Sequence, residues 1–183
     1  MGESMNKAQL INQDSGKTEY YTPQEIIEAA RTTMGGISLD PASSIIANLR
    51  VRADAWFGID DNSLGRAWCD NAWLNHPFSR KGNPLWINKL IREHEIGNVK
   101  QACCITFAAT SEKWFQPLSK YAKCWLSPRT NYFKPDGTLL KGVTKGSVVT
   151  YFGPNIDKFA SMFASFGTVT IPYKEVIGKD IKP

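Results

Sequence analysis

The chain has 183 residues, a length that one hydrophobic core commonly serves, so we expect no separate recognition domain. Hydrophobic residues make up 42% and aromatic residues 11%, which is enough apolar material for the core of a globular protein. The formal net charge of +5 weakly favours a polyanionic partner such as nucleic acid.

The sequence lacks the signals of export and of membrane insertion. Its first residues contain no apolar signal-peptide core, and no run of about 18 apolar residues occurs, so we expect a cytoplasmic protein. Positions 1–18 are polar and aperiodic, as in a flexible N-terminal tail, and positions 19–183 are expected to form a single domain. The 4 cysteines and 2 histidines show no familiar ligand spacing, and no metal is predicted.

The first part of that domain predicts two helices and two short strands. Thr22 is a good capping residue, and the apolar stripe after it predicts a helix that ends at the glycine pair 35–36. A strand at 37–40 then leads into a helix at 42–49, and the loosely alternating segment 51–57 predicts a further strand.

The remaining elements alternate between strands and helices. Apolar runs predict strands at 72–74, 102–109, 124–126, 147–152 and 168–171, and helical spacing predicts helices at 85–96, 111–121 and 155–166. A basic hairpin is expected at about 128–146, because Pro-Asp-Gly at 135–137 is a turn signal. This alternation predicts an α/β fold with a mainly parallel sheet and helices on both faces.

Two polar tetrads follow predicted strands, Asp40-Pro41-Ala42-Ser43 and Asn75-His76-Pro77-Phe78. In a parallel α/β sheet, ligands bind at the carboxyl ends of the strands. We therefore predict that both tetrads belong to the functional site.

Four motifs stand in a specific order and spacing: Tyr21-Thr22-Pro23, Leu39-Asp40-Pro41-Ala42, Asp61 with Leu64 and Trp68, and Asn75-His76-Pro77-Phe78. In these motifs the sequence resembles the phage-type DNA N-6-adenine methyltransferase (Dam-like) family from about Tyr20 to about Ile171. The resemblance implies a Rossmann-like S-adenosylmethionine-dependent methyltransferase fold. It also implies methyl transfer from S-adenosylmethionine to the N6 amino group of adenine in double-stranded DNA, by a phage- or prophage-encoded enzyme in a bacterial host.

The resemblance makes Asn75-His76-Pro77-Phe78 the catalytic tetrad. The lone pair of an aromatic amine is delocalised into the ring, so the Asn75 oxygen and the His76 carbonyl would accept its hydrogens and restore that lone pair. Phe78 would stack on the extruded base. The family usually has Pro at the position of His76, and this departure removes some rigidity from the loop while leaving the carbonyl. Read from its residues alone, the tetrad is equally an ordinary turn that leaves a strand.

The resemblance also assigns a site for S-adenosylmethionine. Asp40 would bind the ammonium of its amino-acid portion, and Asp61 would accept a hydrogen bond from its adenosine. As alternatives, Asp40 is a helix cap, and Asp61, like its neighbour Asp60, is a solvated acid in a loop. The full set of predicted cofactor residues is Tyr21, Thr22, Pro23, Asp40, Pro41, Ala42 and Asp61.

DNA contacts are expected on basic loops beside the tetrad, where phosphate contacts would give salt-dependent affinity. The alternative is an ordinary solvated hairpin. The predicted DNA-binding residues are Arg80, Lys81, Asn83, Arg129, Lys134, Lys141 and Lys145.

Two other functions fit the same motifs. His76 in place of Pro is compatible with a catalytically inactive relative that only binds DNA. The tetrad chemistry also suits another exocyclic amine, such as cytosine N4 or an RNA base. The sequence leaves the recognition site open, together with the choice between monomer and dimer.

Overall fold

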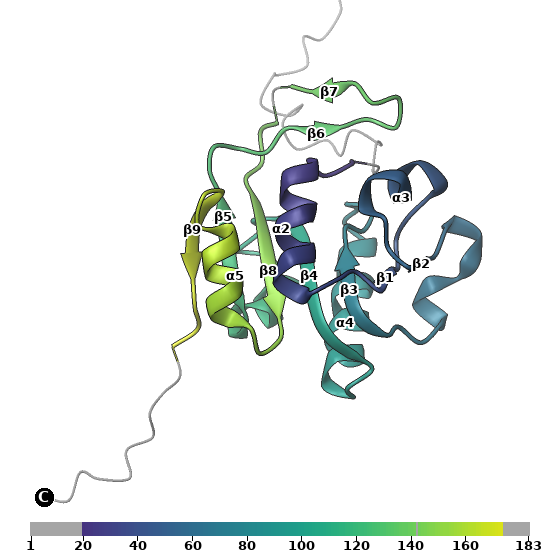
Figure 1. Ribbon diagram of the computed structural model, residues 1–183, viewed down its shortest axis with the longest axis horizontal. Coiled ribbons are helices and arrows are strands. Elements are labelled where there is room, and N and C mark those ends of the chain that lie inside the picture. Colours follow the sequence, from purple (N-terminus) through teal and green to yellow (C-terminus); the bar gives the residue numbers. More distant parts are fainter. Residues whose placement is uncertain (1–19, 142, 174–183) are drawn as a thin grey trace, which may run out of the picture.

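A computed structural model describes residues 20–141 and 143–173. A seven-stranded sheet lies at its centre in the order β2-β1-β3-β4-β8-β5-β9, with helices on both faces (Figure 1). The sheet strands are β1 (Leu39–Asp40), β2 (Ala55–Trp56), β3 (Asp70–Leu74), β4 (Val99–Phe107), β5 (Ala122–Leu126), β8 (Ser147–Phe152) and β9 (Gly167–Thr170). The helices are α2 (Gln24–Met34), α3 (Ile45–Val51), α4 (Gly82–Glu95) and α5 (Ile156–Phe163). The predicted tail, 1–18, lies outside the described residues.

The sheet is mostly parallel. Strands β2, β1, β3 and β4 pair in parallel, whereas β8 runs antiparallel to both of its neighbours, β4 and β5. Strand β9 closes the edge antiparallel to β5, so five of the seven strands point the same way. The predicted α/β class with a mainly parallel sheet and helices on both faces is confirmed at this level.

Two hydrophobic cores lie on opposite faces of the sheet. In β4, Cys103 and Ile105 belong to the core under α2 and α5, while Ala102 and Cys104 belong to the core under α4. All four are fully buried, as expected for a strand covered on both faces. Truncation of an aliphatic residue such as Ile105 in such a core typically costs about 2–5 kcal/mol.

Two local predictions are wrong. Thr22 does not cap α2: the cap position is Pro23, with no side-chain hydrogen bond, and the Thr22 hydroxyl has no partner in the described part of the chain. The predicted helix at 111–121 is only a 3-10 helix, Gln116–Lys120. Pro117 explains this difference, because it has no N–H to donate to residue 113 and its ring clashes with the preceding turn of an α-helix.

A small second sheet consists of β6 (Tyr132–Phe133) and β7 (Leu139–Leu140), which pair antiparallel. The turn between them includes Gly137 at φ 80, a left-handed conformation that favours glycine. Tyr21 joins this hairpin, because its N–H donates to Phe133 O at 2.8 Å and its carbonyl accepts from Phe133 N–H at 2.9 Å. The start of the described chain and the hairpin therefore lie side by side above α2 (Figure 1).

Candidate functional site

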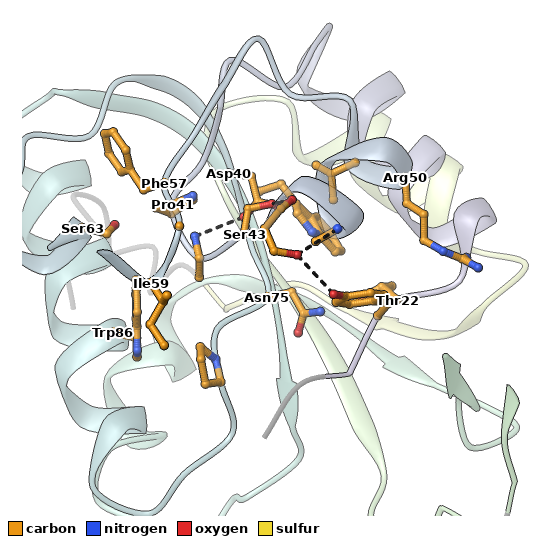
Figure 2. Close-up of a pocket in the computed structure, with 18 of the residues that line it drawn as sticks. Thr22, Asp40, Pro41, Ser43, Arg50, Phe57, Ile59, Ser63, Asn75 and Trp86 are labelled. Atoms are coloured by element: carbon orange, nitrogen blue, oxygen red, sulfur yellow. Dashed lines mark hydrogen bonds between the residues drawn. The ribbon is translucent and has the colours of Figure 1, made fainter. Parts of the chain in front are cut away.

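A cavity of about 300 Å³ opens at the carboxyl ends of β1 and β3 (Figure 2). Leu39 pairs in parallel with Ala72, so Asp40 at the end of β1 and Asn75 just after β3 lie on the same edge of the sheet. Seven of the predicted site residues line the cavity: Tyr21, Thr22, Asp40, Pro41, Ala42, Asn75 and Pro77.

The other predicted cofactor and catalytic residues, Pro23, Asp61, His76 and Phe78, do not line this cavity. Pro23 is at the cap position of α2. The Asp61 carboxylate accepts a hydrogen bond from Gly58 N–H at 2.7 Å and lies 3.5 Å from Arg66. Both of its oxygens therefore have partners close by in the sequence. Asp61 lies beside the cavity, between the lining residues Ile59 and Asn62, without lining it itself.

Asp40 is the buried acid of the cavity, with 2% of its surface exposed. One carboxylate oxygen accepts from Ala42 N–H at 3.2 Å, so the acid also organises its own turn. Burial raises its pKa to about 7, against a smaller opposite effect of hydrogen bonds from Ser43 and Ala42. A cationic ligand group would favour the charged carboxylate at this position.

Two of the buried hydroxyls that lack a hydrogen-bond partner in the described part of the chain, Thr22 Oγ1 and Ser63 Oγ, belong to residues that line the cavity. Figure 2 shows these two residues on opposite sides of it. An unpaired buried polar group typically costs about 1–3 kcal/mol. Polar groups of a ligand at either side of the cavity would relieve this cost.

Several cavity residues were not predicted from the sequence. Phe57 is joined to the tetrad after β1, because its N–H donates to Asp40 O at 3.0 Å and its carbonyl accepts from Ser43 N–H at 2.8 Å. Ile59 lines the same cavity although it is 95% exposed, and it gives the opening an apolar edge. The one local sign that Ile59 has a special role is its position as an apolar residue between a glycine and two acids.

Arg50 and Trp86 are further unpredicted lining residues. The Arg50 guanidinium lies 4.3 Å from the ring centre of Phe133 in the hairpin. No local sequence pattern marked either residue as a cavity residue, since long-range packing brings both there.

Asn75 and Phe78 both contact Tyr20. The Asn75 amide nitrogen donates to the Tyr20 carbonyl at 2.6 Å. The ring of Phe78 lies 6.1 Å from that of Tyr20 in a stacked arrangement and 4.5 Å from that of Phe107, and only 5% of Phe78 is exposed. Stacking of Phe78 on an extruded base would require this aromatic cluster to rearrange.

His76 is packed inside the protein. Its ring stacks on Trp86 at 6.3 Å and meets Phe78 edge-on at 5.4 Å. Burial lowers its pKa to about 4, so the ring is neutral near pH 7. Its Nδ1 lies 3.2 Å from Pro77 O, while Nε2 has no partner among the described residues. Packing thus restrains the loop at His76.

The predicted DNA-binding residues lie on two surfaces. Arg80 and Lys81 are exposed just before α4, and half-buried Asn83 lies in its first turn. In the hairpin region Arg129, Lys141 and Lys145 are exposed and Lys134 is half-buried. Within residues 20–141 and 143–173, none of these six cations forms an ion pair with another side chain.

Two further observations concern metal ligands and membrane-spanning helices. Across the described residues, no group of three or more His, Cys, Asp or Glu side chains is placed to hold a metal ion. The helices of the same part include none that is long and apolar enough to span a membrane.

The sheet and its cavity define an α/β protein with one buried acid and one amide at the carboxyl edge of adjacent parallel strands. The chain belongs to the DNA N-6-adenine-methyltransferase (Dam) family, whose model matches residues 11–164. No protein with a curated description matches the sequence.

Proposed function

We propose that this chain transfers a methyl group from S-adenosylmethionine to the N6 amino group of adenine in double-stranded DNA. Family membership supports adenine methylation in DNA. The observation that carries the assignment to this site is that Asp40 and Asn75 line one cavity at the carboxyl edge of the sheet. The strand order, with antiparallel β8 between β4 and β5, supports a Rossmann-like methyltransferase fold.

The cavity residues fit S-adenosylmethionine. The carboxylate of Asp40 would pair with the α-ammonium, and the unpaired hydroxyls of Thr22 and Ser63 would bond polar groups of the ligand. Phe57 and Ile59 offer apolar contact for a purine ring. A volume of about 300 Å³ lies at the lower end of the usual range for small-molecule sites.

Asn75 and His76 would act on the target amine. The bound cofactor supplies an electrophilic methyl group on a sulfonium. The Asn75 oxygen and the His76 carbonyl accept the two N6 hydrogens, so that the nitrogen lone pair points at the electrophile. Asn75 has no basic group, and the buried His76 ring lies outside the cavity. The surplus proton therefore leaves for solvent after transfer, once the nitrogen has become positively charged.

The basic surfaces would hold the duplex over the cavity. Arg80 and Lys81 follow the catalytic tetrad directly, and the hairpin that carries Lys134 and Lys141 is joined to Tyr21 beside the cavity. Positive side chains at both places favour phosphate contacts on the two sides of an extruded base. We further propose a role in modifying phage or prophage DNA.

The direct test is transfer of labelled methyl from S-adenosylmethionine to duplex DNA of varied sequence. We expect label in N6-methyladenine after digestion, and we expect Asn75→Ala to reduce transfer by at least about 100-fold, since one such polar contact contributes that much. Binding of S-adenosylhomocysteine, measured by calorimetry, is the control and is expected to survive in Asn75→Ala. Label in N4-methylcytosine, or DNA binding with no transfer by the unmodified protein, would refute the proposal.

A further inference from the structure

The orientation of the Asn75 amide decides whether the proposed reaction is possible. An asparagine side chain presents an oxygen that accepts and an NH2 group that donates. Only the oxygen can bind the hydrogens of an amino group, whereas the NH2 group would oppose them. A rotation by half a turn exchanges the two with almost no change in shape, so a hydrogen-bond partner has to select the productive orientation.

Tyr20 supplies such a partner. Asn75 Nδ2 donates to the main-chain carbonyl of Tyr20 at 2.6 Å. A carbonyl only accepts, so the flipped amide would place Asn75 Oδ1 against another oxygen and lose this bond. Within residues 20–141 and 143–173, Asn75 Oδ1 makes no hydrogen bond and is not buried, and Figure 2 shows Asn75 beside the cavity. The bond to Tyr20 therefore leaves the oxygen available.

The hairpin holds this carbonyl in place. Tyr21, the next residue, exchanges two main-chain hydrogen bonds with Phe133 at 2.8 and 2.9 Å. The ring of Tyr20 also packs against Tyr132, with ring centres 5.8 Å apart, and stacks on Phe78. The position of one carbonyl thus depends on strand β6.

We propose that Tyr20 is a positioning residue for Asn75. Its main-chain carbonyl, fixed by pairing of Tyr21 with Phe133, orients the amide so that Oδ1 meets the target amino group. This inference rests on the proposed function and extends it to a residue outside the catalytic tetrad.

The test replaces Asn75 by an acid of the same shape. The carboxylate of Asn75→Asp cannot donate to Tyr20 O, whereas its protonated form can, so the carbonyl favours protonation. We expect this carboxyl to titrate at least about one pH unit above the ordinary aspartate value of about 3.9. Side-chain 13C NMR of the full-length variant measures this directly.

Two further substitutions, each combined with Asn75→Asp, separate the effect of Tyr20 on the pKa of the introduced carboxyl from other effects on it. Burial also raises this pKa, and the charged residues Asp40 and Arg50 line the same cavity. Phe133→Pro removes the N–H that holds Tyr21, while Phe133→Ala removes the side chain and keeps that N–H. The raised pKa is expected to persist with Phe133→Ala and to lose at least half of its elevation with Phe133→Pro.

An ordinary pKa in Asn75→Asp, or equal values with Phe133→Ala and Phe133→Pro, would overturn the inference. An inactive unmodified protein would refute the proposed function instead, and the titrations would still decide the placement of Tyr20.

Discussion

The guanidinium of Arg50 lies over the ring of Phe133, 4.3 Å from its centre, and joins a cavity-lining residue of α3 to the basic hairpin. The same Phe133 is paired through its main chain with Tyr21, which also lines the cavity. The proposed cofactor site and the proposed DNA surface are therefore connected through one residue.

This contact predicts that the two ligands influence each other. In Arg50→Ala, S-adenosylhomocysteine binding in the presence of DNA is expected to weaken more than binding in its absence. The expected difference is about 0.5–1 kcal/mol, the usual strength of an exposed cation–π contact. Phe133→Leu, which keeps the backbone pairing, is expected to show the same weakening, with no further weakening in the double variant. Titration calorimetry with and without duplex checks this, and additive effects would contradict a direct Arg50–Phe133 link.

Because Asp40 is buried, we predict that both protein stability and ligand affinity at the proposed cofactor site depend on pH. Its folded pKa of about 7 lies above the unfolded value of 3.8, so the unfolded state ionises first. The stability of the unliganded protein is therefore expected to decline as pH rises from about 4 to about 7 and then to level off. A ligand ammonium selects the carboxylate, so affinity for S-adenosylhomocysteine is expected to be about tenfold higher at pH 8 than at pH 6.

Asp40→Asn is the control for that pH dependence. It removes the titration while keeping the size of the side chain, so both the stability decline and the affinity change are expected to disappear. Thermal melts and calorimetry across the same pH range measure the two effects. A pH response that persists in Asp40→Asn would assign it to another group.

The role of the loop at His76 can be tested by comparing two substitutions that both remove the imidazole ring. Both His76→Pro and His76→Gly lack the packing against Trp86 and Phe78, but only proline restricts the loop backbone. We expect similar decreases of unfolding free energy, on the order of 1–3 kcal/mol. The expected kcat is at least about tenfold higher for His76→Pro than for His76→Gly. Equal turnover would mean that loop rigidity does not limit the reaction.

The hairpin lysines predict the salt dependence of DNA binding. Removing one phosphate-binding cation reduces the slope of log affinity against log salt by about 0.9. The triple substitution of Lys134, Lys141 and Lys145 by Gln is therefore expected to flatten that slope by about 2 to 3. Lys100→Gln is the control, because Lys100 is the second residue of β4, at the end of the strand opposite to the cavity, and is paired with Asp70 at 2.6 Å. An equal effect of Lys100→Gln would indicate unspecific attraction.

Local patterns were sufficient for most of the sheet and for the position of the cavity. Strand β4 was predictable because its residues are apolar without interruption from Ala102 to Ile105, and the glycine pair 35–36 marked the end of α2. Asp40 and Asn75 were predictable because parallel neighbours end at one edge. These features depend only on neighbours in sequence and on general rules of sheet topology.

The remaining features depend on long-range packing. Arg50 reaches the cavity on a short helix, and the Tyr20 carbonyl meets Asn75 across 55 positions of sequence. Phe78 is covered by Phe107 and Tyr20, which no spacing rule near the tetrad could indicate. Pro117 was visible in the sequence, and its missing N–H should have argued against an α-helix at 111–121.

The insertion of β8 between β4 and β5 has a consequence for synthesis of the protein. Strand β5 leaves the ribosome before β8, yet it has no place in the sheet until β8 has paired with β4. The hairpin that holds Tyr21 is made in the same interval. A nascent chain that already contains every residue of the proposed catalytic tetrad therefore still lacks the finished site, and the proposed methylation has to wait for the C-terminal strands to fold.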